Sequence, residues 1–249
     1  MERPPAAWTS LRRFTPARVA IGRVGNGLPT GAHLAFQAAH AAARDAVHAA
    51  LDIDALRAAL GETGLESIPV RSLCAGRDEY LLRPDRGRRL HPEARPGLTA
   101  AARPGAIVFA VCDGLSATAV QAHAAPLLSL VAPALARDGV AVAPIVVATQ
   151  GRVALGDEIG EALAAEAVVV LIGERPGLSA PDSLGAYLSW QPRRGRTDAE
   201  RNCISNIRPE GLPIPQASAK LLWLIREMRR LRLSGVGLKD EHGAAAIAG

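Results

Sequence analysis

The second half of the chain alternates between continuous apolar runs and stretches with a helical pattern. The apolar runs cover residues 106–112, 140–148 and 167–172, and the helical patterns cover 117–137 and 157–165. Strands that are apolar along their whole length are buried on both faces, which is typical of a parallel sheet covered by helices. The pattern therefore predicts an α/β fold, with a Rossmann-like parallel sheet and helices on both faces.

The first half has a different pattern. Residues 1–29 are rich in Arg, Pro and Gly and predict irregular structure. An alanine-rich helix is expected from Thr30, its N-cap, to about residue 51, and a second short helix covers 54–60. Residues 67–73 alternate like a strand, and residues 77–90 predict a charged, arginine-rich loop.

Three prolines, Pro92, Pro96 and Pro104, separate these two patterns. Prolines at this density mark connections between structural units. We therefore expect a smaller, mainly helical N-terminal region over residues 1–100 and the Rossmann-like domain over residues 101–249. The second unit ends in an amphipathic helix over residues 213–233.

Composition narrows the class of protein. The chain has 249 residues, of which 49% are hydrophobic, so it can bury a sizeable core. Its three cysteines form no CxxC pair, which favours a reducing compartment over a disulfide framework. No apolar run approaches eighteen residues and the first residues contain no apolar signal core, so we expect neither a membrane span nor a signal peptide.

The basic charge does not indicate a nucleic-acid partner. The formal net charge is +5, and almost all of the 29 basic residues are arginines spread along the whole chain. Nucleic-acid binders gather their charge on one face and interleave aromatic residues for stacking. Aromatic residues make up only 3% of this chain, which argues against such a role.

Topology alone predicts where a ligand binds. Right-handed crossovers place the carboxyl ends of all parallel strands at one edge of the sheet, where open α/β sheets bind their ligands. Three segments follow the three predicted strands, at residues 113–116, 150–156 and 173–177. We expect these segments to converge.

Several common chemistries are excluded, because the sequence has no GxGxxG, no P-loop and no GxSxG elbow. His123 lies within a predicted helix, where a surface position is expected. His33, His40 and His48 form the one histidine cluster, and their spacing favours solvated or half-buried side chains over a metal site. We therefore predict neither a catalytic set nor a metal site in this chain.

The sequence leaves the roles of two carboxylates and two thiols undecided. Asp113 and Glu174 follow predicted strands, so each either binds a ligand or caps a helix or pairs with Arg152 or Arg175. The Cys112 thiol ends a buried strand and is expected to be inert. A thiolate role for Cys203 has little support, because no histidine lies near it in sequence.

One stretch, residues 173–211, is too polar for a core and too rich in Gly and Pro for a casual linker. Its segments GERPGLSAPDSLG and ERNCISNIRPEG closely resemble the small (light) subunit of ethanolamine ammonia-lyase. Four further blocks that match the same family lie earlier in the chain, in the expected order, at residues 20–23, 80–90, 113–116 and 151–161. The resemblance covers nearly the whole chain from Ala17.

The resemblance implies a function and a partner. Enzymes of this family use adenosylcobalamin to convert ethanolamine to acetaldehyde and ammonia by a radical mechanism. A separate large subunit, a TIM barrel, holds the substrate, and the small subunit covers the other side of the cobalamin. The chain is then expected to act in a hetero-oligomer and to be inactive alone, with segment 77–90 contacting the large subunit. The other readings are a stand-alone small-molecule hydrolase or transferase and a non-catalytic assembly protein.

The resemblance also assigns three cofactor-binding positions, which fall on Val153, Glu174 and Cys203. The cofactor is expected base-on, because residues 240–243 depart from the DxHxxG signature of base-off proteins, which would need Gly at Ala245. The expected location is the cytoplasm. A bacterial microcompartment is the alternative, since some relatives carry a longer N-terminal extension linked to packaging.

Overall fold

The computed structural model describes residues 6–15 and 17–240, so the start of the chain and most of the 240–243 tail motif lie outside the described residues. Its centre is a six-stranded sheet with the strand order β1-β3-β2-β4-β5-β6. The first four strands in this order are parallel, and β5 and β6 are antiparallel to their neighbours. The strands are β1 (Ser67–Arg71), β2 (Ile107–Cys112), β3 (Ile145–Thr149), β4 (Ala167–Gly173), β5 (Leu184–Trp190) and β6 (Arg201–Ile207).

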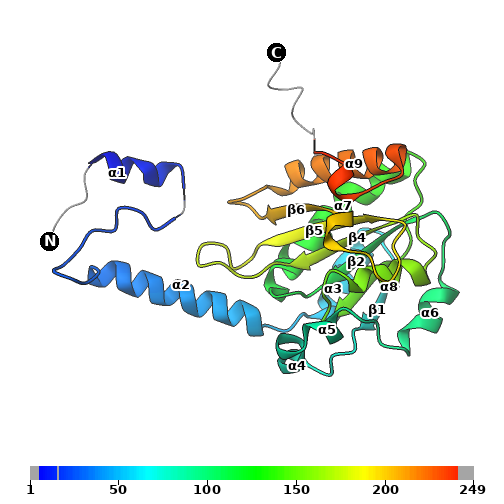
Figure 1. Ribbon diagram of the computed structural model, residues 1–249, viewed down its shortest axis with the longest axis horizontal. Helices are drawn as coiled ribbons and strands as arrows, with labels where there is room; N and C mark the ends of the chain where they lie inside the picture. The colour runs from blue at the N-terminus through cyan, green and yellow to red at the C-terminus, as the bar shows by residue number, and fades with distance from the viewer. Residues whose placement is uncertain (1–5, 16, 241–249) are drawn as a thin grey trace, which may run out of the picture.

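Helices cover both faces of this sheet (Figure 1). Helices α3, α7 and α9 pack on one face, and α6 and α8 pack on the other. The helices are α1 (Ala6–Ser10), α2 (Thr30–His48), α3 (Ile53–Glu62), α4 (Arg77–Leu82), α5 (Pro84–Gly87), α6 (Ala94–Ala100), α7 (Ala117–Arg137), α8 (Leu155–Ala162) and α9 (Ile214–Leu231). The predicted α/β fold with helices on both faces is confirmed.

The central strands explain the continuous apolar runs. In β2, Ile107, Phe109 and Val111 point to the α7 side, whereas Val108 and Ala110 point to the α8 side. Every residue of β2 and β4 is buried, because both faces are covered. Helix α7 is, among the described helices, the one long and apolar enough to cross a membrane, but 61% of its apolar window is buried in the core.

The structure corrects several local predictions. Residues 77–90, expected to be a loop, contain α4 and α5, and residues 6–13, expected to be irregular, contain α1 and a 3₁₀ turn. The antiparallel strands β5 and β6 lie in the stretch 173–211, where sequence reasoning expected only a structured loop.

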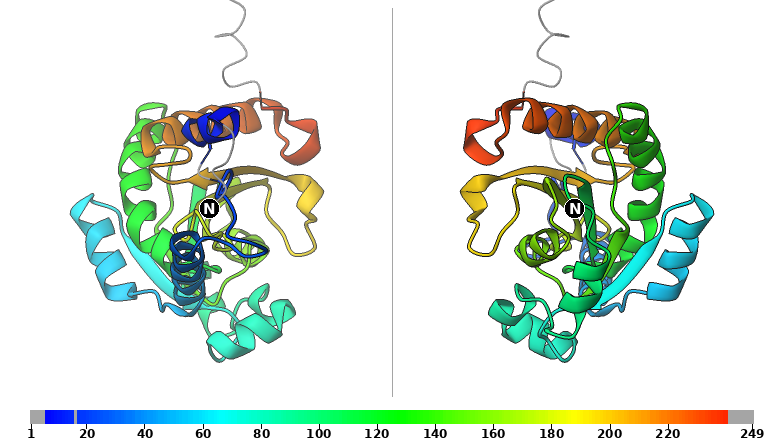
Figure 2. Two further views of the ribbon diagram at one scale, coloured as in Figure 1. Left: turned by 90° about the vertical axis from the view of Figure 1, so that its left-hand side faces the viewer. Right: turned by 90° about the vertical axis from the view of Figure 1, so that its right-hand side faces the viewer.

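The first hundred residues contribute to the same sheet. The predicted strand at 67–73 is present as β1, which pairs in parallel with β3. The division into units at residue 100 stays a prediction. Helix α2 extends away from the sheet (Figure 1) and is seen nearly end-on in Figure 2, and Ala46 is its one buried residue.

Candidate functional site

The three segments at the carboxyl ends of the parallel strands meet, as topology predicts. The Asp113 carboxylate, 3% exposed, follows β2 and accepts hydrogen bonds from the backbone N–H groups of Gln150 (2.9 Å) and Gly151 (3.1 Å) after β3. It also accepts from Gly114 N, and Arg77 Nη1 lies 3.9 Å away. Burial raises the pKa of the Asp113 carboxyl, and these donors offset part of that rise. Asp113 therefore fastens two of the segments together.

Two glycines bring the third segment into contact. Gly114 has φ +59°, and a Cβ there would lie 2.2 Å from the carbonyl oxygen of Gly173. A Cβ on Gly173 would lie 2.0 Å from the carbonyl oxygen of Ser116. Leu115 N donates to Gly173 O at 2.8 Å. The turn after β2 thus packs backbone to backbone against the end of β4.

Two adjoining hollows open at this edge. The central hollow, of about 430 Å³, has an apolar part formed by Leu115, Val153 and Ile172 and a polar part that includes Glu174. The arginine hollow, of about 510 Å³, is lined by residues 84, 88, 152–154, 187 and 196–198. Arg152, Val153 and Tyr187 line both, so the two hollows form one continuous surface.

The three positions assigned by resemblance lie around these hollows. Val153 lines both hollows and Glu174 lines the central one. Cys203, on β6, is the register partner of Tyr187 on β5. Tyr187 therefore connects the three, and sequence reasoning did not identify it, because the strand that carries it was not predicted. Burial and the neighbouring Cys203 thiol raise the pKa of the Tyr187 phenol.

The two oxygens of Glu174 have different surroundings. Oε2 accepts hydrogen bonds from Ser183 Oγ (2.5 Å) and Asn206 N (3.1 Å). No hydrogen bond within the described residues engages Oε1, which lies close to Gly185. Glu174 is thus anchored through a hydroxyl and a backbone amide, and the considered pairing with Arg152 or Arg175 is not found.

An aromatic ring supports the floor of the site. Tyr80 of α4 is fully buried and contacts two guanidinium groups, with Arg152 4.1 Å and Arg77 4.8 Å from its ring centroid. Arg152 Nη2 also donates to Tyr80 O at 3.1 Å. Arg77 donates to the carbonyls of Val47 and Gly114. The segment expected to be a loop therefore forms part of the site.

The other candidate residues are placed as follows. Cys112 is fully buried, and burial raises the pKa of its thiol, as expected for an inert cysteine. His33, His40 and His48 are exposed on α2. His123, expected at the surface, is instead buried, with Nε2 3.6 Å from Asp182 Oδ2, because the loop before β5 covers this face of α7.

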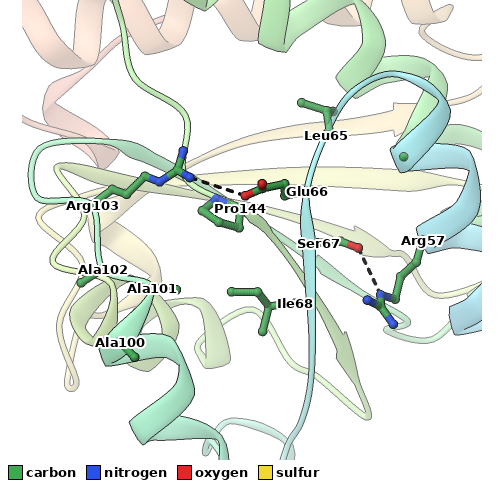
Figure 3. A pocket seen from close by; sticks show the side chains of 11 residues that line it. Arg57, Leu65, Glu66, Ser67, Ile68, Ala100, Ala101, Ala102, Arg103 and Pro144 are labelled. Atoms are coloured by element: carbon green, nitrogen blue, oxygen red, sulfur yellow. Dashed lines mark hydrogen bonds and ion pairs between the residues drawn. The ribbon is translucent and has the colours of Figure 1, made fainter.

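A further hollow, of about 690 Å³, lies at the opposite edge of the sheet (Figure 3). Both of its arginines have partners: Arg103 lies 3.5 Å from Glu66, and Arg57 Nε donates to Ser67 Oγ at 3.2 Å. None of the three converging segments reaches this edge. The carboxyl edge is therefore the better candidate for a ligand site.

Comparison with known proteins agrees with the resemblance. Residues 5–239 match the family model described as ethanolamine ammonia-lyase light chain. The chain is 55% identical to the ethanolamine ammonia-lyase small subunit of Azotobacter vinelandii, covering 100% of this chain and 94% of the relative. It is 56% identical to that of Ralstonia nicotianae, covering 94% and 88%, and 54% identical to that of Pseudomonas syringae pv. tomato, covering 96% and 84%. The chain belongs to the ethanolamine ammonia-lyase light-chain family, the small subunits of a carbon–nitrogen lyase.

Proposed function

We propose that this chain binds adenosylcobalamin, base-on, at an interface with a TIM-barrel large subunit, and that the complex converts ethanolamine to acetaldehyde and ammonia by a radical mechanism. The observation that carries the proposal is the placement of Val153, Glu174 and Cys203. They come from three separate segments: Val153 and Glu174 line one continuous surface, and Cys203 pairs in register with Tyr187, which lines both hollows.

The chemistry of this surface fits the periphery of cobalamin. The corrin ring carries amide side chains around an apolar macrocycle. Glu174 Oε1 offers an acceptor to an amide N–H, and Leu115, Val153 and Ile172 offer apolar contact. No histidine is among the described residues that line the two hollows, which supports a base-on cofactor.

The proposed division of labour is the one that the family resemblance implies. When bound, the cofactor would supply a cobalt–carbon bond for homolysis, and the large subunit would hold the substrate. This chain positions the cofactor and excludes water from one side of it. We propose the cytoplasm as its location, with a bacterial microcompartment as the alternative.

Segment 77–90 is the proposed contact with the large subunit. Several of its arginines are held by carboxylates: Arg83 pairs with Asp85 within the segment at 2.8 Å, and Arg89 pairs with Glu158 of α8 at 2.6 Å. These pairs hold the segment in a defined conformation. The Leu82 side chain on this segment is 79% exposed. Exposed apolar side chains and arginines are both features of interfaces.

The experiment is co-purification with the large subunit. A combined charge reversal, Arg83→Glu with Arg88→Glu, is expected to weaken co-elution. The matched control is Arg137→Glu with Arg193→Glu, at two exposed arginines outside the segment, which should leave co-elution intact. Equal behaviour of the two double variants would remove segment 77–90 from the interface.

A further inference from the structure

The arginine hollow carries positive charge that the chain itself does not neutralise. Arg88 is exposed, and no ion pair or hydrogen bond of its side chain is found within the described residues. Arg152 contacts the Tyr80 carbonyl and ring but has no carboxylate partner there. In a chain whose arginines so often pair with carboxylates, two that face one hollow without such a partner indicate a place for an anion.

The other charged groups around the hollow are already engaged. Arg196 donates to Trp190 O at 3.0 Å and pairs with Glu200. Asp198 lies at the rim, with its side chain 95% exposed and 3.5 Å from Arg201 Nε. The charge that remains available to a ligand is therefore that of Arg88 and Arg152.

The arginine hollow adjoins the central hollow. It shares Arg152, Val153 and Tyr187 with the central hollow, where Glu174 provides an acceptor. A molecule that spans both hollows would present hydrogen-bond donors to the carboxylate side and an anion to the arginine side. Cobalamin has this distribution, with amides around the corrin ring and one anionic phosphodiester in its nucleotide tail.

We propose that the arginine hollow binds the phosphodiester of the nucleotide tail, through the guanidinium groups of Arg88 and Arg152. This inference rests on the proposed function, that is, on cobalamin binding at this edge. Guanidinium groups match phosphate oxygens with two parallel N–H donors, so the contact would also fix how the tail enters the interface.

The test compares two corrinoids on the assembled complex. Cobinamide lacks the nucleotide tail and its phosphodiester, whereas cobalamin has both. Arg88→Ala is expected to raise the dissociation constant of cobalamin about ten- to hundredfold, the range for a hydrogen bond to a charged group, and to leave that of cobinamide unchanged. Arg88→Lys, which keeps the charge without the planar fork, should recover part of the loss.

Arg193→Ala is the matched control, since Arg193 is exposed on a neighbouring loop and does not line the hollow. It should change neither dissociation constant. Because Arg88 also lies in segment 77–90, each dissociation constant is measured on complex that has been isolated by co-elution of the two subunits. Equal losses for cobalamin and cobinamide, or no loss for either, would overturn the phosphodiester contact. A wild-type complex that binds neither corrinoid would instead refute the proposed function.

Discussion

The two oxygens of Glu174 allow ligand binding and loop anchoring to be separated by one substitution. In Glu174→Gln, the amide oxygen can replace Oε2 and still accept from Ser183 Oγ and Asn206 N. The amide nitrogen then occupies the place of Oε1, where it presents a donor to a donor. We expect cofactor affinity to fall by about 1.5–3 kcal/mol, or about ten- to hundredfold.

Stability should respond differently. The two anchoring bonds lose their charge assistance in Glu174→Gln, so the free energy of unfolding should fall by only about 1 kcal/mol. Glu174→Ala removes both bonds and leaves the Ser183 and Asn206 donors unpaired, so a loss of about 2–3 kcal/mol is expected. This differs from the expectation for a carboxylate with no contacts in its own chain, whose removal would barely change stability.

Ser183→Ala is the matched control. It removes one donor to Oε2 and leaves Oε1 in place, so it should lower the free energy of unfolding by about 1 kcal/mol and change affinity little. Cobalamin titration of the reconstituted complex and denaturant unfolding of each variant measure the two quantities. If Glu174→Gln binds cobalamin as tightly as wild type, Glu174 is not a ligand. If it resembles Ser183→Ala in both assays, Glu174 only holds the loop.

Three further outcomes are expected. Gly173→Ala should lower the free energy of unfolding by about 1–3 kcal/mol or more, and the melting temperature with it, since its Cβ would lie 2.0 Å from Ser116 O and 2.7 Å from Asp113 O; an unchanged melting temperature would contradict this backbone contact. A thiol reagent should label Cys203 alone in the folded chain, because Cys74 and Cys112 are buried and burial raises the pKa of both; rapid labelling of a second thiol would count against the packing. Hydrogen bonds from Thr197 and Arg196 lower the pKa of Glu200 to about 2 from 4.5, so its stabilising contribution is complete above about pH 4.5 and is lost as the pH falls toward 2. An NMR titration that places the Glu200 pKa near 4.5 would show that these bonds do not form in solution.

The sequence predicted the parallel core well, because β2 and β4 are buried on both faces and read as continuous apolar runs. It did not predict β6, where only Arg201, Ile204 and Ile207 are buried. These buried residues are three apart, the register shifts between Leu184 and Ala186 of β5, and the first of the three, Arg201, is buried through its pairing with Asp157 at 2.6 Å. None of these features fits the alternation on which strand prediction depends.

The site was predicted in part for similar reasons. Topology located the three converging segments, and resemblance supplied Val153, Glu174 and Cys203. Tyr187 could not be found, because its role depends on the register of β5 against β6. The contacts of Tyr80 with Arg77 and Arg152 could not be predicted either. A charged segment that contains proline has the sequence pattern of a loop, and the pairing of its charges depends on the folded structure.

The most direct test of the central claim is a spectroscopic titration of adenosylcobalamin into this chain, into the large subunit and into their mixture, with ethanolamine turnover measured in parallel. We predict that tight cofactor binding and turnover both require the mixture, because under the proposed function this chain forms one wall of the cofactor site and supplies no catalytic residues. Turnover by this chain alone, or equally tight binding by the large subunit without it, would contradict the account.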